Sequence, residues 1–440
     1  MTGPTSHSPL RIVQITPGAG KMYCGACLRD NALVTALRRM GHSVVMAPLY
    51  LPLTLDEEDQ TAGSPVFFSG INVYLDQQSA SFRHAPAWLH RLLAARPLLE
   101  MASGAAGRTN VADLGELTLS MLRGEDGNQA RELNDLIAWL RVEKPDVVCL
   151  SNALLAGLAR QIHAELRIPV VGTLQGEDFF LDSLPEPHRR DAWRTMAERA
   201  ADVDLFIAPS RYFATHMAER LRLPPERVKV VYNGINLDGY DRAPERPGPP
   251  VLGYFARMCR EKGMDQLVEA FIRLKKREGL RGLKLRLGGS CGPMDRPFVA
   301  AARQALAAAG VLGDVDFSPN VSREEKLAFF QSLSVFSVPA TYGEAFGLFV
   351  IEALAAGVPV VQPEHGAFGE LMAATGGGVL CKPDDPEALA DSLATLLSAP
   401  ERARALGQAG QATVRERFTV DVMAQAVAAV CQEAVRNFPS

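Results

Sequence analysis

The segment that decides the fold runs from residue 339 to 359 and reads Pro-Ala-Thr-Tyr-Gly-Glu-Ala-Phe-Gly-Leu-Phe-Val-Ile-Glu-Ala-Leu-Ala-Ala-Gly-Val-Pro. A short apolar run, 334–338, precedes it and predicts a buried strand. From residue 347 to 356 every residue except Glu352 is apolar or favours helix, and a glycine and a proline then end the pattern. The segment therefore predicts a strand, a loop and a buried helix in succession.

Two carboxylates lie around the start of this helix. Glu344 is in the loop that leads into it, and Glu352 is inside it, eight positions later. A buried carboxylate is costly unless something pairs with it. The helix start offers free backbone N–H groups and the positive end of the helix dipole, which suit phosphate. This combination favours a ligand that carries hydroxyl groups and phosphate, such as a nucleotide-sugar.

The same residues resemble a known family element. Glu344-Ala-Phe-Gly-Leu-Phe-Val-Ile-Glu352, with the sequence around it, is similar to the E-x7-E element of retaining family 4 glycosyltransferases. The resemblance implies an α/β protein of the GT-B fold, with two Rossmann-like parallel-sheet domains facing across a cleft that holds a nucleotide-sugar. It also implies transfer of a sugar with retention of the anomeric configuration. The competing interpretation is a buried helix with one capped or snorkelling glutamate.

Composition and charge restrict the class of protein. A length of 440 residues favours two domains, and 47% hydrophobic with 22% charged residues is ordinary for globular proteins. The net charge of -4 gives no indication of nucleic-acid binding. No apolar run approaches the roughly 20 residues that span a bilayer, and residues 1–9 lack a signal-peptide pattern. With seven scattered cysteines, the chain is expected to be cytoplasmic.

The amino-terminal half begins as a βαβ unit. Residues 11–16 predict a strand, and Pro-Gly-Ala-Gly-Lys at 17–21 predicts a loop at the carboxyl edge of a parallel sheet. The loop does not follow the dinucleotide-binding pattern G-x-G-x-x-G. The resemblance implies that Gly18 and Gly20 approach the donor diphosphate and that Lys21 contacts the sugar or acceptor. A tight turn without a ligand is the alternative.

Cys24 and Cys27 follow this loop, just ahead of a predicted helix. A helix start lowers the pKa of a thiol, so a redox or metal role is one interpretation. Zinc needs two more ligands, and the chain has no second C-x-x-C. The other two interpretations are that Cys24 lines the acceptor pocket and that the cysteine pair serves only packing.

Residues 56–127 resemble the family least. Apolar residues recur there at helical spacing, which predicts a helical insertion at about 76–130. Arginines and histidines make the segment 83–108 basic and amphipathic. Such a segment can lie on the inner face of a membrane, cover an acceptor, or pack on its own domain.

Alternation of strands and helices resumes near residue 131. After a strand at 169–173, family members often have a histidine at the donor sugar, whereas this chain has Gln175. No catalytic base is therefore assigned at this position. Gln175, Glu177 and Asp178 are candidate sugar or acceptor contacts, with loop capping as the alternative.

Three parts are predicted along the chain. Residues 238–250 have the proline, glycine and charge content of a linker. We predict an acceptor domain at 1–240, a nucleotide-sugar donor domain at 248–418, and a final helix at 419–440 that crosses back to the first domain.

The second half supplies the donor residues. Arg257 and Lys262 match the arginine and lysine by which family members hold the donor phosphates, whose charge grows as the nucleoside diphosphate leaves. A solvated charged loop is the alternative. Gly288 lies where a loop is expected to pass the nucleotide, and Glu370 is a candidate sugar contact.

The resemblance also assigns roles within the key segment. Backbone N–H groups of Ala345-Phe346-Gly347-Leu348 hold the distal phosphate, Glu344 accepts hydrogen bonds from the donor sugar, and Glu352 accepts them from the ribose. Together with Arg257 and Lys262, Glu344 is a candidate catalytic residue.

Two segments match a pattern from a different class of glycosyltransferase. Asp202-Val-Asp204 and Asp314-Val-Asp316 fit the Asp-x-Asp element by which GT-A enzymes hold manganese. Each opens a predicted strand, where aspartate is a common turn residue. We therefore expect no metal and no cofactor apart from the nucleotide-sugar co-substrate.

The donor and acceptor are less defined. UDP-sugar is the expected donor, with GDP next, and a sugar, a glycolipid or a small molecule can be the acceptor. A catalytically silent sugar-nucleotide-binding protein is one alternative, because of Gln175 and the unusual glycine loop. A membrane-surface enzyme with a lipid acceptor is another, because of segment 83–108.

Overall fold

The chain divides into two units of internal contact. The computed structural model describes residues 8–18, 25–51, 59–61, 64–68, 111–240 and 248–439. Unit 1 comprises the residues up to 209 with 213–231 and 423–440, and unit 2 comprises 210–212 with 232–422. Gly20, Lys21, Cys24, segment 83–108 and most of the predicted insertion lie outside the described residues.

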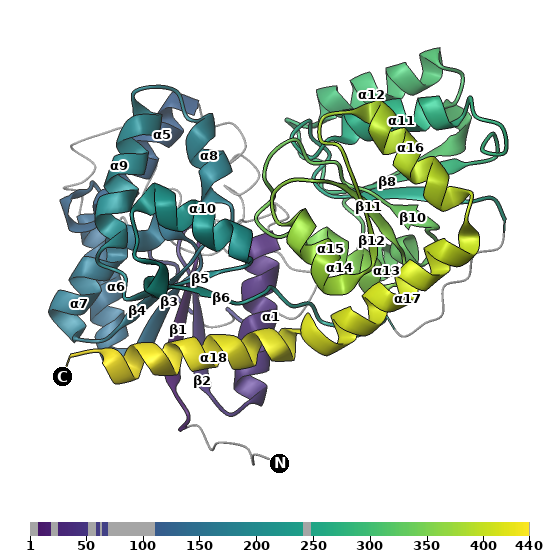
Figure 1. The fold of residues 1–440 in the computed structure, drawn as a ribbon. Coiled ribbons are helices and arrows are strands. Elements are labelled where there is room, and N and C mark those ends of the chain that lie inside the picture. The colour runs from purple at the N-terminus through teal and green to yellow at the C-terminus, as the bar shows by residue number, and fades with distance from the viewer. Residues whose placement is uncertain are drawn as a thin grey trace, which may run out of the picture. The chain divides into compact units, whose positions relative to one another are not determined.

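Unit 1 is built on a parallel sheet (Figure 1). Among the described residues its strand order is β2-β1-β3-β4-β5-β6. Strands β3 and β4 are buried along their whole length, as expected for parallel strands covered by helices on both faces. The strands are β1 (Arg11–Thr16), β2 (Ser43–Pro48), β3 (Val147–Leu150), β4 (Val170–Thr173), β5 (Leu205–Ala208) and β6 (Val228–Val230).

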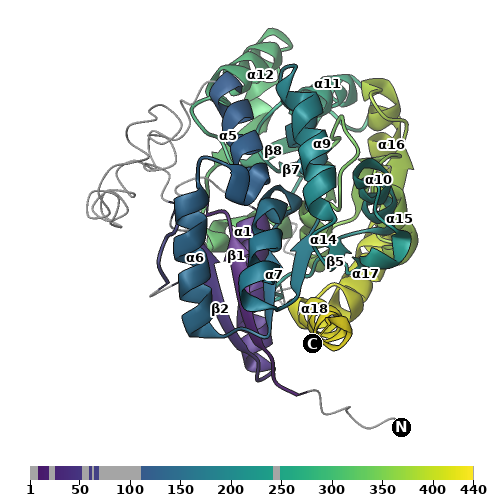
Figure 2. The ribbon, with the colours of Figure 1, turned by 90° about the vertical axis from the view of Figure 1, so that its left-hand side faces the viewer.

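Helices connect the strands of unit 1. Figure 2 looks onto the side of the sheet where α6 and α7 lie. The helices are α1 (Gly25–Arg39), α5 (Val111–Arg123), α6 (Ala130–Glu143), α7 (Ala159–Leu166), α8 (Glu177–Ser183), α9 (His188–Ala200) and α10 (Arg211–Leu221). A 3₁₀ turn, Ala153–Leu158, directly precedes α7.

The last helix, α18 (Val420–Asn437), returns to unit 1 from the end of the chain. Its Cys431 Sγ lies 3.5 Å from Sγ of Cys149 in β3. Its Glu433 pairs with Lys229 of β6 at 2.7 Å. The helix therefore completes the packing of a sheet whose strands all come from the first 230 residues.

Unit 2 repeats the architecture. In the part of the chain that is described, its strand order is β12-β11-β10-β7-β8-β9, with parallel pairing throughout. The strands are β7 (Val251–Phe255), β8 (Lys284–Gly289), β9 (Val315–Pro319), β10 (Val335–Phe336), β11 (Val360–Pro363) and β12 (Gly378–Cys381). The helices are α11 (Met264–Leu274), α12 (Arg296–Ala308), α13 (Arg323–Gln331), α14 (Leu348–Ala355), α15 (Phe368–Thr375), α16 (Pro386–Leu397) and α17 (Pro400–Arg417).

The predicted strand, loop and buried helix of the deciding segment are confirmed as β10 and α14. Three residue placements differ from expectation. Gly288 belongs to the end of β8 and not to a loop. Glu177 and Glu370 lie in the first turns of α8 and α15 and not in loops. In both cases a short helix begins a few residues after a strand, and its periodicity is too brief to read from sequence. No helix among the described residues is long and apolar enough to cross a membrane.

Candidate functional site

The predicted donor residues of unit 2 meet at one edge of its sheet. The strand order reverses between β7 and β10, and ligands of open α/β sheets bind outside the carboxyl ends of strands at such a point. Arg257 and Lys262 follow β7, whereas Glu344 and the start of α14 follow β10. The topology therefore brings two cations, a carboxylate and a helix amino end to the same crevice.

Arg257 is held by a buried aspartate that the sequence analysis missed. Its Nε lies 3.1 Å and its Nη2 2.9 Å from Oδ1 of Asp295. The Asp295 side chain is 7% exposed, whereas the Arg257 side chain is 59% exposed. The buried Tyr254 also donates its hydroxyl to the Arg257 carbonyl, at 2.7 Å. The guanidinium is thus fixed on one side and open to an anion on the other.

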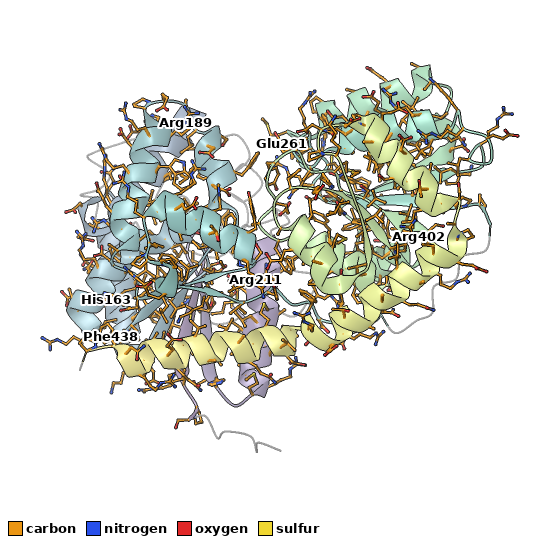
Figure 3. The ribbon with its side chains drawn as sticks, in the orientation of Figure 1. His163, Arg189, Arg211, Glu261, Arg402 and Phe438 are labelled. Carbon is orange, nitrogen blue, oxygen red and sulfur yellow. The ribbon has the colours of Figure 1, made fainter. Side chains whose placement is uncertain are left out.

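The loop that carries Lys262 is fixed to the loop after β10 by a close backbone approach. Gly263 has φ +70°, and a Cβ at this position would lie 1.8 Å from the carbonyl oxygen of Pro339. Glycine is therefore required there. Beside it, the Thr341 amide donates to the carbonyl of Glu261, which Figure 3 labels, at 3.0 Å. Lys262 is thus presented from a loop that cannot shift without moving residues 339–341.

Lys262 pairs with the first glutamate of the key segment. Its Nζ contacts Oε2 of Glu344 and the hydroxyl of Tyr342 at short range. The Tyr342 hydroxyl is 3.2 Å from the same carboxylate oxygen. The Lys262 and Glu344 side chains are 20% and 13% exposed. A cation and an acceptor carboxylate therefore lie side by side in a half-enclosed position, where electrostatic interactions are stronger than in open water.

The start of α14 has the features of an anion site. Gly347, with φ +96°, caps the helix, so the first amides of α14, beginning at Leu348, lack partners within the helix. Ala345 and Phe346 just before it are 6% and 2% exposed, which anchors the loop in the core. The predicted phosphate-binding amides therefore belong to a well-packed turn beside Glu344.

Glu352 pairs with a lysine from another helix. Its Oε1 lies 3.2 Å from Nζ of Lys326 in α13. The structure thus supplies the partner that a carboxylate in this apolar helix needs.

Gly288 and Glu370 have other surroundings. A Cβ at Gly288 would meet the rings of Phe255 and Phe329, so this glycine serves core packing. Glu370 has its partners within unit 2, to which residues 210–212 belong: its oxygens accept from the amides of Arg211 and Tyr212, each at 3.1 Å, and from the Tyr232 hydroxyl at 2.7 Å. Arg211, labelled in Figure 3, lines with Glu370 a hollow of about 490 Å³.

The sheet edge of unit 1 reverses order between β1 and β3. Gly18, after β1, has φ +75°, and a Cβ there would lie 1.9 Å from the carbonyl oxygen of Leu51. This close approach explains the glycine by backbone geometry alone. Of the cysteine pair, Cys27 is described; it is 2% exposed, and Thr16 Oγ1 lies 3.9 Å from its Sγ.

The candidate contacts after β4 are partly engaged with protein. The Glu177 carboxylate accepts from the amides of Ala153 and Gln175, each at 2.8 Å. Burial raises the pKa of Glu177 to about 7, although these hydrogen bonds oppose the rise. Asp178 Oδ2 lies 3.1 Å from Nε2 of His216 in α10. An imidazole thus contacts Asp178, three positions after Gln175, from a helix further along the chain.

A second buried carboxyl group, Asp30, lies in α1. It contacts the neighbouring Arg29, and Arg29 Nη2 lies 3.4 Å from Thr173 Oγ1 at the end of β4. Burial raises the pKa of Asp30, and the Arg29 charge opposes the rise. Burial therefore raises the pKa of both Asp30 and Glu177 in unit 1.

The two Asp-x-Asp segments are occupied by basic side chains. Asp202 contacts Arg160 at 3.0 Å, and Asp204 lies 2.8 Å from His163. Asp314 contacts Lys275 at 2.9 Å. Among the described residues no group of three or more histidine, cysteine, aspartate or glutamate side chains is arranged to hold a metal ion.

Comparison with known proteins connects this arrangement to a family. The sequence profile "Glycosyl transferases group 1" matches residues 241–413, and the profile "Glycosyltransferase Family 4" matches residues 113–238. The chain is 32% identical over 320 residues to the D-inositol 3-phosphate glycosyltransferase of Thermobispora bispora, covering 69% of each chain. It belongs to the family 4 glycosyltransferases. Four further relatives of the same name are matched over only 46% to 59% of their own length.

Solved structures show the fold of this family member. Sucrose-phosphate synthase from Thermosynechococcus elongatus superposes with a TM-score of 0.70 at 17% identity, covering 96% of this chain and 98% of that one. The Anabaena protein HepE in complex with UDP-glucose gives a TM-score of 0.67 at 17% identity, covering 96% and 100%. The predicted GT-B fold class is thereby confirmed.

Sequence reasoning missed three side chains of the site: Asp295, Lys326 and Tyr342. Tyr342 lies two positions before Glu344 and was inside the quoted segment. Asp295 directly precedes α12, which follows β8, and Lys326 lies in α13, which follows β9; no local pattern links them to their partners. Only the strand order of the sheet brings them to the same edge.

Proposed function

We propose that this chain transfers a sugar from a nucleotide-diphosphate sugar to an acceptor hydroxyl, with retention of the anomeric configuration and without a metal ion. The observation that carries the proposal is the grouping of Arg257, Lys262, Glu344 and the amino end of α14 at one sheet edge. Family membership supports a nucleotide-sugar donor. UDP is the proposed nucleoside diphosphate because HepE, of the same fold, is described with UDP and UDP-glucose.

Each residue of the candidate site has a separate proposed role in the reaction. The bond between the anomeric carbon and the diphosphate oxygen breaks, and a bond to the acceptor oxygen forms on the same face of the sugar. The acceptor proton passes to the leaving phosphate, and the nucleoside diphosphate departs. Negative charge grows on the leaving group, and Arg257, Lys262 and the α14 amides stabilise it. Glu344 accepts hydrogen bonds from the sugar hydroxyl groups, and Glu352 accepts them from the ribose.

Arrival of the donor redistributes one ion pair. Lys262 Nζ contacts Glu344 in this structure, and a phosphate oxygen can compete for that ammonium group. Arg257 has no such exchange to make, because Asp295 holds its Nε and Nη2 while the side chain stays largely exposed. Two cationic side chains and a helix end supply the positive charge that a divalent metal supplies in other glycosyltransferases, which supports a metal-independent reaction.

Acceptor recognition is proposed for unit 1. Gln175, Glu177, Asp178 and His216 lie at or near the carboxyl end of β4. Amide, carboxyl and imidazole groups suit a hydroxyl-rich acceptor, whether a free sugar, a glycolipid headgroup or another small polyol. The lipid-acceptor alternative rests on segment 83–108, outside the described residues, and flotation with anionic vesicles at low salt tests it.

The test combines ligand stabilisation with turnover. Thermal unfolding is measured with UDP, GDP and ADP, with and without EDTA, and slow hydrolysis of the matching sugar donors is followed in parallel. Ligand at a hundredfold over Kd adds roughly 2.7 kcal/mol of stability. Selective stabilisation by one diphosphate and donor hydrolysis, both unaffected by EDTA, are expected. Stabilisation without hydrolysis favours the silent binding protein, and loss of hydrolysis in EDTA contradicts metal independence.

A further inference from the structure

The buried ion pair between Lys326 and Glu352 is not explained by the stability of the fold alone. Nζ and Oε1 lie 3.2 Å apart, and the two side chains are 6% and 14% exposed. Taking two such charges out of water costs free energy that their attraction only partly returns. A well-packed apolar pair would stabilise the same helix contact about as well. The charges therefore indicate a use other than holding α13 against α14.

The geometry makes the lysine the inner partner. Lys326 is the more deeply buried of the two, so the accessible surface of the pair belongs mainly to the carboxylate. An ionised carboxylate offers about four acceptor positions, and one ammonium contact leaves most of them open. Lys326 thus holds one oxygen of Glu352 while the group can still accept hydrogen bonds from a ligand.

Both helices are fixed close to the pair. Ser322 and Glu325 form a capping box at the start of α13, with reciprocal hydrogen bonds of 3.2 and 2.8 Å. On α14, Val350 and Ile351 next to Glu352 are fully buried. A charged group carried by a rigid helix and held by a second rigid helix has one orientation, which is what selective hydrogen bonding requires.

We propose that Lys326 is a positioning residue that orients Glu352 to recognise the ribose diol of the donor nucleotide. The proposal rests on the proposed function, which places Glu352 at the ribose. The ligand class is a nucleoside diphosphate whose 2′- and 3′-hydroxyl groups are both intact. A site built to accept hydrogen bonds from a hydroxyl group rejects an analogue that lacks it, because the buried acceptor then stays unpaired.

A matched ion pair in the same unit provides the control. Lys275 Nζ pairs with Asp314 at 2.9 Å, and the Lys275 side chain is 8% exposed, close to that of Lys326. Asp314 directly precedes β9, so this pair lies at the amino ends of the strands, opposite the donor loops. Lys275→Met removes a comparably buried ammonium group without touching the proposed site.

Calorimetric titration with UDP, ADP and GDP and with their 2′,3′-dideoxy counterparts tests the proposal. Wild type should bind the ribose form of its preferred diphosphate about 10–100 times more tightly than the dideoxy form. Lys326→Met should reduce this ratio to about threefold or less, Lys326→Arg should retain most of it, and Lys275→Met should match wild type. If Lys326→Met does not fold, Lys326→Gln takes its place with the same expected loss.

The outcomes separate the two proposals. A wild type that binds no diphosphate overturns the proposed function and this inference with it. Binding of ribose and dideoxy forms with equal affinity overturns the inference alone, as does a Lys326→Met variant that keeps the full ratio. A lower affinity for both forms with an unchanged ratio assigns Lys326 a structural role, which also contradicts the inference.

Discussion

Carboxyl groups have different partners at the carboxyl ends of the two parallel sheets. In unit 2, the carboxylates of the site contact basic side chains, as in Arg257–Asp295 and Lys262–Glu344. In unit 1, Glu177 is buried and bound by two backbone amides, and burial raises its pKa to about 7. One edge therefore maintains separated charges that an anionic ligand can use. At the other edge, burial raises the pKa of the Glu177 carboxyl group, so this group binds a proton more readily than an exposed glutamate does.

This contrast supports the proposal that unit 2 binds the donor and unit 1 the acceptor. A phosphate gains from fixed cations in a half-enclosed position. A sugar hydroxyl gains from groups that donate or accept hydrogen bonds without adding a fixed positive charge, such as the Gln175 amide. Substitutions in either unit test this contrast.

The largest effect is expected from Lys262→Met. It removes a cation from the leaving diphosphate and leaves Glu344 without its ammonium partner. We expect kcat/KM for donor hydrolysis to fall about 10²–10³-fold. Steady-state kinetics measure this, with Lys275→Met as the control that should stay near wild type. A fall below threefold would remove Lys262 from the donor site.

The next largest effect concerns Gly263. Alanine there must adopt φ +70° with its Cβ 1.8 Å from the Pro339 carbonyl oxygen. The loop that carries Lys262 must therefore separate from residues 339–341. We expect a loss of about 3 kcal/mol in unfolding free energy. Gly279→Ala is the matched control, because Gly279 has φ +80° but nothing within 4 Å of the added Cβ. It should lose only about 1–2 kcal/mol, and equal losses in the two variants would show that the loop contact is unimportant.

Glu177 gives unit 1 a characteristic pH dependence. Its pKa is about 7 in the folded protein against 4.5 as the ordinary value, so the folded state keeps a proton that the unfolded state has lost. Stability should therefore fall as pH rises from about 4.5 to 7 and then level off, by up to about 3 kcal/mol. Denaturation at several pH values measures the slope, which Glu177→Gln should flatten. Parallel profiles for wild type and variant would rule out this carboxyl group as the cause.

The smallest effect is expected from Asp295→Asn. The neutral amide still fills the space but holds the Arg257 guanidinium less firmly. We expect the donor KM to rise about tenfold with a smaller change in kcat. Asp316→Asn serves as the control, because Asp316 pairs with Arg286 at 3.1 Å in a more exposed position. Equal KM values in the two variants would separate Asp295 from donor binding.

The fold was predictable because its signals are local. Each signal, such as a short buried strand, the glycine at 357 that follows the key helix, or the restart of the pattern at 251, spans only a few residues. Parallel sheets with buried strands leave such signals in any chain. The placement of Glu177 in a helix was not predictable, because α8 covers only 177–183 and begins immediately after Gly176 in a left-handed conformation.

Candidate site residues could be named from the sequence where a local segment resembles the family, and not where their partners come from elsewhere. Arg257 and Glu344 were named through that resemblance, and their roles stay predictions. Asp295, Lys326 and His216 reach their partners from positions 38, 26 and 38 residues away. Such pairs depend on strand order, which the sequence pattern alone does not specify.

The return of α18 has a consequence for the order of synthesis. Unit 1 is discontinuous: residues 232–422 are made after its last strand and before its last helix emerges. At about 5–20 residues per second, a ribosome needs roughly 10–40 s for that stretch. During this interval the surface of β3 around Cys149, which Cys431 and its apolar neighbours finally cover, has no partner from α18. The nascent chain therefore completes its second unit before its first, and an exposed apolar surface on the first is where a chaperone is expected to bind.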